Sequence, residues 1–153
     1  MDQTPIRPAS YDGDLAAWAD EQAALIRAGR FERLDLEHIA EEIESVGISE
    51  RREITSRLAV LLTHLLKWQH QPDRRGASWD RTLREQRKRI ERRLQKMPSL
   101  RPMLTDPDWI DEAWGDAVTA AVAETGIELA AFPEVCPWPL QDALCEGWTP
   151  GAA

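Results

Sequence analysis

The sequence predicts an all-α fold: a single compact helical bundle of about five helices, with a proline-rich C-terminal tail packed on it. Apolar residues recur at three- and four-residue intervals in several segments, which is the spacing of half-buried helices. Glycine and proline separate these segments. Alternating runs of β-branched residues, the pattern of strands, do not occur. A length of 153 residues fits one domain, so we treat 1–153 as a single domain and expect residues 1–10 to be flexible.

The first helix is predicted from about Asp12 to Ala28. Gly29 should end it, because glycine accepts the left-handed conformation that closes the last carbonyls of a helix. We expect Phe31 to fold back on the last turn. The half-buried stripe of this helix has the spacing i, i+3, i+4, i+7. Its members are Leu15, Trp18, Gln22, Leu25 and Ile26.

A second helix should begin at Asp35, whose carboxylate suits an N-cap, and end near Gly47. Its apolar line consists of Leu36, Ile39, Ile43 and Val46.

A third helix is predicted from Ser49 to Gln71, where Pro72 stops it. Apolar side chains cover well over half of its circumference, so we expect this helix to be the centre of the bundle. One polar stripe, which includes Arg57 and His64, remains on the surface of this helix. The leucines predicted to be nearly inaccessible are Leu58, Leu61, Leu62 and Leu65.

The fourth helix should run from Trp79 to Met97, with Ser78 as its N-cap. Its apolar line is narrow, which places it on the outside of the bundle with most of its basic side chains in solvent or against a partner. That line consists of Trp79, Leu83, Ile90, Leu94 and Met97.

A last long helix is predicted from Asp108 to Thr125, with Asp106 as its cap, Pro107 at its first position and Gly126 at its end. The tail that follows is too rich in proline for a helix until residues 140–146.

The charge is strongly segregated along the chain. Residues 1–66 carry 7 basic and 13 acidic side chains, residues 67–101 carry 12 and 4, and residues 102–153 carry none and 10. The formal net charge of −8 disfavours nucleic acid at long range, although the basic helix 79–97 suits either an anion or an acidic protein surface. The N-terminal segment lacks a signal-peptide core, and no segment is apolar enough to span a membrane, so we expect a cytoplasmic protein.

Several motifs together resemble a bacterial family known as domain of unknown function 29. They include Glu50-Arg51-Arg52-Glu53, Leu65-Leu66-Lys67-Trp68-Gln69-His70-Gln71-Pro72 and the tail motif Phe132-Pro133 with Cys136-Pro137. The resemblance covers nearly the whole chain, although His70 stands where the family typically has an aromatic residue. It implies an all-α bacterial domain of this length, and it implies no activity.

Arg57 and His64 form the sharpest catalytic candidate. Seven residues bring a helix back to within about 20° of the same direction, so both side chains leave one face. An arginine that binds phosphate and a histidine that exchanges protons are what metal-independent RNA cleavage requires. The spacing resembles the Arg-x4-6-His motif of HEPN-type ribonucleases, although Leu58 replaces their usual polar residue. The alternative is a solvent-facing stripe in which Glu53 pairs with Arg57.

A metal site is a weaker candidate, because neither Glu-x-x-His nor His-Glu-x-x-His occurs. The side chains considered for it are Glu37, His38, Glu41 and Glu44 with His64 or His70. We expect no metal and no cofactor, and we interpret Glu37, Glu41 and Glu44 as a solvent-exposed face. The function we favour from sequence is a non-enzymatic interaction or regulatory protein, forming a homodimer or binding another protein in the bacterial cytoplasm. The alternative is a HEPN-like ribonuclease or nucleic-acid-associated module.

Overall fold

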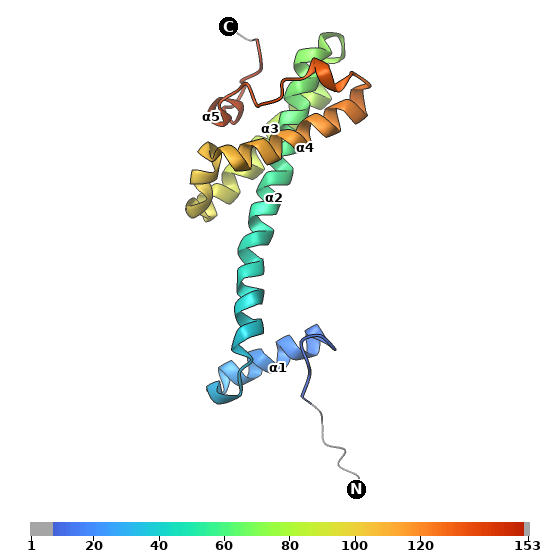
Figure 1. Cartoon of the computed structure of the whole chain (residues 1–153). Helices are drawn as coiled ribbons and strands as arrows, with labels where there is room; N and C mark the ends of the chain where they lie inside the picture. Colours follow the sequence, from blue (N-terminus) through green and yellow to red (C-terminus); the bar gives the residue numbers. More distant parts are fainter. Residues whose placement is uncertain (1–7, 152–153) are drawn as a thin grey trace. The chain divides into compact units, whose positions relative to one another are not determined.

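A computed structural model describes residues 8–151 and is entirely helical in its regular structure (Figure 1). The predicted all-α class is therefore confirmed. Contacts within the chain cluster into two units, Met1–Ile48 and Ser49–Ala153, which we describe separately. The α-helices of the described residues are α1 (Leu15–Arg27), α2 (Leu36–His70), α3 (Ala77–Lys96), α4 (Pro107–Thr125) and α5 (Leu140–Ala143). Short 3-10 segments are η1 (Phe31–Arg33), η2 (Pro72–Arg74), η3 (Pro98–Thr105) and η4 (Leu129–Ala131).

In the first unit, α1 ends as its sequence predicts but begins at Leu15, later than the predicted Asp12. Asp14 caps it by accepting a hydrogen bond from the amide of Ala17. At the other end Gly29 adopts a φ of 71°, and the amide of Arg30 returns to the carbonyl of Leu25. Phe31 does not fold back on this turn and is 64% exposed, which corrects the expectation.

The start of the chain is only partly described. Of residues 1–10, which we expected to be flexible, residues 1–7 lie outside the described residues. Ala9 donates its amide to Glu21, and Ser10 accepts the amides of Gly13 and Asp14. Ala9 and Ser10 therefore have defined partners.

One helix, α2, replaces the two that the sequence predicts. Gly47 does not end a helix, and Ser49 does not begin one, because the helix runs unbroken from Leu36 to His70. An interior glycine costs a helix only about 1 kcal/mol, which the favourable residues on either side offset.

The core of the second unit is built around residues 54–66 of α2. Leu58, Leu61, Leu62 and Leu65 have no exposed surface, as predicted. The neighbouring helices and the tail supply the other buried side chains. These include Leu83, Ile90 and Leu94 of α3, Trp109, Ala113, Trp114 and Ala117 of α4, and Phe132, Leu140 and Ala143 of the tail.

The basic helix α3 begins earlier than predicted, at Ala77, and its N-cap position is Gly76 rather than Ser78. Ser78 lies inside the first turn, where its carbonyl accepts the hydroxyl of Thr82. The apolar line has a gap between Leu83 and Ile90, which the sequence left open. Arg87 fills that gap and is 8% exposed.

The last long helix, α4, begins and ends as predicted. The carboxylate of Asp106 accepts the amide of Asp108, Pro107 occupies the first turn, and Gly126 closes the helix with a φ of 72°. The tail then packs on the second unit, as predicted, although α5 covers only Leu140–Ala143. The indole of Trp114 donates to the carbonyl of Pro133 and fixes the start of the tail.

Candidate functional site

Arg57 lies on the outer edge of the second unit, engaged with acidic side chains. Its Nη2 lies 2.6 Å from Oε1 of Glu53, the i−4 residue of the same helix. Arg93 of α3 contacts Glu53 at 3.7 Å and Glu50 at 2.5 Å. The ion pair that the sequence predicted between Glu53 and Arg57 is thus confirmed, and it extends across two helices.

His64 has no acidic hydrogen-bond partner of this kind among the described residues, and its ring bonds to the backbone of its own helix. Its Nδ1 donates to the carbonyl of Val60 at 2.9 Å, which leaves Nε2 as the proton-free nitrogen of the neutral ring. Burial lowers the pKa of His64 below its usual value, opposed by the bond to Val60 and reinforced by the nearby Lys67. Lys67 pairs in turn with Glu124 of α4 at 2.7 Å.

The two members of the Arg57–His64 hypothesis therefore have separate surroundings. Arg57 lines a cavity with α3, and His64 is not among the residues that line it. The electrostatic partners of His64 are Lys67 and Glu124. Their common helix face does not bring the two side chains to one pocket.

The cavity beside Arg57 is strongly basic. It has a volume of about 550 Å³ and lies between α2 and α3. Three of its side chains, on successive turns of α3, have no ion-pair partner among residues 8–151. Its lining consists of Arg57, Arg89, Arg92, Arg93, Lys96, Glu50 and Met97.

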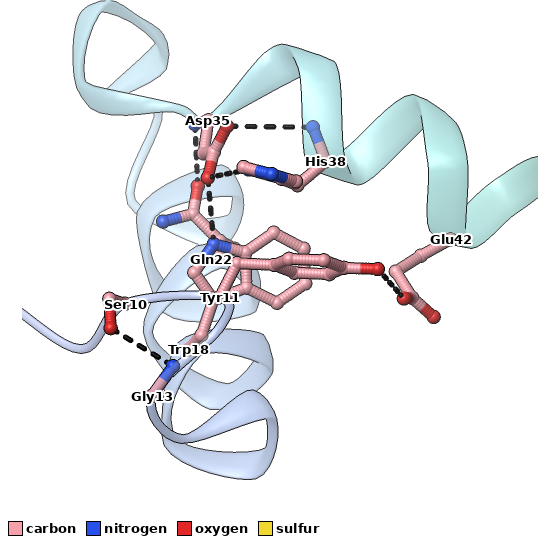
Figure 2. A network of polar contacts seen from close by, with 8 residues as sticks. All are labelled: Ser10, Tyr11, Gly13, Trp18, Gln22, Asp35, His38 and Glu42. Atoms are coloured by element: carbon pink, nitrogen blue, oxygen red, sulfur yellow. Dashed lines mark hydrogen bonds and ion pairs between the residues drawn. The ribbon is translucent and has the colours of Figure 1, made fainter.

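A separate polar network ties α1 to the start of α2 in the first unit (Figure 2). Asp35 accepts hydrogen bonds from Nε1 of Trp18 at 3.0 Å and from Nδ1 of His38 at 2.7 Å. Its amide donates to the side chain of Gln22. The ring of Tyr11 stacks on His38 with centroids 4.1 Å apart. The sequence identified Asp35 only as a cap, and nothing in its spacing predicted the stacked pair.

These contacts shift three pKa values. The bond to His38 lowers the pKa of Asp35, and the same bond raises the pKa of His38. Tyr11 donates its hydroxyl to Glu42 at 2.6 Å, and this bond, aided by nearby carboxylates, raises the pKa of Tyr11 to about 12. The network thus favours the charged forms of Asp35 and His38 and the neutral form of the Tyr11 hydroxyl.

The same part of α2 also presents an apolar face to solvent. Leu36 and Ile43 are each 68% exposed and Val46 is 65% exposed. Their spacing of seven and three residues places them within about a third of the helix circumference. The apolar line predicted from sequence also contained Ile39, which is half-buried, and the structure leaves its other members exposed, namely Leu36, Ile43 and Val46. We call these three residues the apolar stripe.

A comparison with protein-family models shows the family of the chain. The family described as domain of unknown function DUF29 matches residues 10–149. The chain belongs to the DUF29 family. The searches of curated proteins and of solved structures found no match to it.

DUF29 membership confirms the resemblance carried by the sequence motifs, and the family description names no activity. The chemistry must therefore be inferred from the side chains. Among residues 8–151 no group of three or more His, Cys, Asp or Glu side chains is arranged to hold a metal ion. No described helix is long and apolar enough to cross a membrane.

Proposed function

We propose that this DUF29 chain is a non-enzymatic interaction module of the bacterial cytoplasm that works as a homodimer. The observation that carries the proposal is the apolar stripe Leu36, Ile43 and Val46, which is exposed on one face of a regular helix. Isolated exposed apolar residues are common, but three large ones in register on a helix are typical of a surface that is covered in the working assembly.

A second copy of the chain is the occupant that fits this stripe. Symmetric dimers bury the same patch on both subunits, so one stripe supplies both halves of the interface. Burying an aliphatic side chain contributes about 1.5–3 kcal/mol, so six such side chains offer a substantial driving force.

Charge favours the same occupant. Acidic side chains flank the stripe on α2, among them Glu37 and Glu44, whereas residues 67–101 carry an excess of eight positive charges. Lys88 of α3 is exposed and lacks an ion-pair partner among the described residues. The acidic surface of one copy can therefore attract the basic helix of another as the two copies approach, which gives an association that weakens with salt.

Sedimentation velocity of two matched variants tests the proposal. Ile43→Asp places a carboxylate in the stripe, and Ser45→Asp places the same group two residues away, on the opposite side of α2. We expect the parent and Ser45→Asp to sediment as dimers at micromolar concentration in low salt, and Ile43→Asp to sediment as a monomer. A monomeric parent, or equal behaviour of the two variants, would contradict the proposal.

The ribonuclease hypothesis is the second candidate, favoured only by the position of Arg57 in a basic cavity. Its test is incubation of the parent with several single-stranded RNAs and EDTA near neutral pH. General acid–base catalysis contributes roughly 10²–10⁴-fold, so a twofold effect of Arg57→Ala or His64→Ala would not support it. We expect no cleavage, because Arg57 is paired with Glu53 and His64 lies outside that cavity.

A further inference from the structure

We propose that the basic cavity between α2 and α3 binds a small ligand that carries two or more negative charges on phosphate groups. The proposal is independent of dimer formation, because every lining residue belongs to the second unit and none belongs to the apolar stripe. It assigns a ligand site to a part of α3 that the core does not use.

The arrangement of α3 supplies three of the cations. Arg89, Arg92 and Lys96 follow one another at intervals of three and four residues, so they project from one face of the helix. All three are exposed at the cavity. None has an ion-pair partner among residues 8–151, in contrast to Arg84 and Arg93 of the same helix.

The inner wall of the cavity is fixed by acidic residues. Glu50 holds Arg93 at 2.5 Å, and Glu53 holds Arg57 at 2.6 Å. These pairs neutralise the inner arginines in part and orient them. Arg89, Arg92 and Lys96 have no acidic partner among the described residues, so the cavity as a whole attracts anions.

Arg57 offers one further donor. Its Nε is buried and has no hydrogen-bond acceptor among the described residues. A buried guanidinium nitrogen without an acceptor is unfavourable, so the Arg57 side chain that lines the cavity is not fully satisfied by the chain itself.

The side chains specify the ligand class. A guanidinium presents paired donors that match the oxygens of phosphate, and several of them around one concavity suit a multiply charged group. A volume of about 550 Å³ lies in the range of small-molecule sites. The net charge of −8 works against a long polyanion such as RNA, because most of the surface would repel it.

Isothermal titration calorimetry of the full chain tests the site with inorganic pyrophosphate, with ADP in the absence of Mg²⁺, and with citrate as a polycarboxylate. We expect both phosphate ligands to bind more tightly than citrate, and both to weaken between 50 and 200 mM NaCl. Tighter binding of ADP than of pyrophosphate would show that the ligand is an ester, and the reverse would show free phosphate.

Matched charge reversals locate the site. Arg92→Glu should weaken pyrophosphate binding by about tenfold or more, the loss expected for one charge-assisted hydrogen bond. Arg81→Glu changes the same charge on the same helix, at an exposed position outside this cavity, and should change binding by less than about threefold. Glu50→Gln should tighten binding, a gain that unfolding cannot produce.

Three outcomes would overturn the proposal. The first is no binding of either phosphate ligand at millimolar concentration. The second is equal weakening of pyrophosphate binding by Arg92→Glu and Arg81→Glu, which would show that binding depends on the overall positive charge of α3 and not on a defined site. The third is an RNA oligonucleotide that binds far more tightly than pyrophosphate and displaces it, which would assign the cavity to nucleic acid.

Discussion

The interior leucines of α2 hold the second unit together. Leu62 has no exposed surface and lies in the cluster formed with α3, α4 and the tail. Leu62→Ala removes three carbon atoms from that cluster and leaves a cavity, so we expect a loss of about 2–5 kcal/mol in the free energy of unfolding. Urea denaturation measures the loss.

Val60→Ala is the matched control for this prediction. Val60 belongs to the same helix and is 39% exposed, so its truncation should change the free energy of unfolding by less than about 0.5 kcal/mol. If Leu62→Ala and Val60→Ala have the same urea midpoint, the assignment of α2 as the central helix is wrong.

The pair of Asp35 and His38 makes the first unit sensitive to pH. The pKa of His38 is raised in the folded chain, so its contribution is complete below pH 6.5 and is lost as pH rises through that raised value. The pKa of Asp35 is lowered, so its contribution is present above pH 3.8 and is lost as pH falls through the lowered value. We expect α1 to be best protected between these limits.

Hydrogen exchange of the α1 amides across pH, corrected for the intrinsic rate, measures this dependence. Asp35→Asn keeps the size of the side chain and removes its charge, so the loss of protection above pH 6.5 should become shallower in that variant. A His38 ring whose NMR titration midpoint lies below 6.5 would contradict the prediction.

At the level of elements, sequence periodicity predicted α1, α4 and the buried face of α2 well. It failed at Gly47, because glycine ends a helix only when its backbone turns left-handed, and residue type alone does not show whether it will. The helical residues on both sides of Gly47 keep α2 unbroken. Gly29 and Gly126 do adopt a positive φ, so there the same rule succeeded.

The sequence predicted the local pairing in the candidate site but not the side chains that another helix contributes. Helix spacing places Arg57 and His64 on one face, but each side chain then follows its own partner, Glu53 for one and the carbonyl of Val60 for the other. The contributions of Arg89 and Lys96 depend on how α3 packs against α2, which no local spacing contains. The pairing of Glu53 with Arg57 is local, and it was predicted.

Arg87 shows how a charged residue can belong to the core. It donates from Nε to the carbonyl of Ala143 at 2.9 Å and from Nη2 to the carbonyl of Trp148 at 2.5 Å, so it ties the tail to α3. A signal existed in the sequence, because position 87 continues the apolar line between Leu83 and Ile90. The burial of Arg87 was not predicted from this position, because arginine is mostly exposed in proteins.

Arg87→Ala should therefore loosen the tail. The substitution leaves the buried carbonyl of Ala143 and the partly buried carbonyl of Trp148 without these donors, which costs about 1–3 kcal/mol. We expect faster chymotrypsin cleavage after Trp148 and a lower urea midpoint. Lys88→Ala, at the exposed neighbouring position, should leave both unchanged. Equal cleavage of the two variants would show that the tail is held by its apolar contacts alone.

For the molecule as a whole, burial is unequal between the two units. Trp18 is the only large apolar residue of the described first unit that is buried, whereas the second unit buries a continuous cluster. Regions with few buried contacts open at lower free energy. We expect amides of α1 to exchange with deuterium much faster than those of residues 54–66, as measured by mass spectrometry.

Exchange in α1 as slow as in residues 54–66 would show that one cooperative unit spans the chain, in agreement with the single domain predicted from sequence. Protection of residues 36–48 that rises with protein concentration would support burial of the apolar stripe between copies.

Thiol reactivity is the most direct test of the central claim, that the apolar stripe is covered by a second copy. Ile43→Cys and Ser45→Cys, each in a Cys136→Ser, Cys145→Ser background, place one thiol in the stripe and one on the opposite side of α2. We predict that alkylation of the Ile43→Cys variant slows as protein concentration rises through the micromolar range, while the Ser45→Cys variant reacts at a constant rate. Equal rates for both thiols at every concentration would contradict the claim.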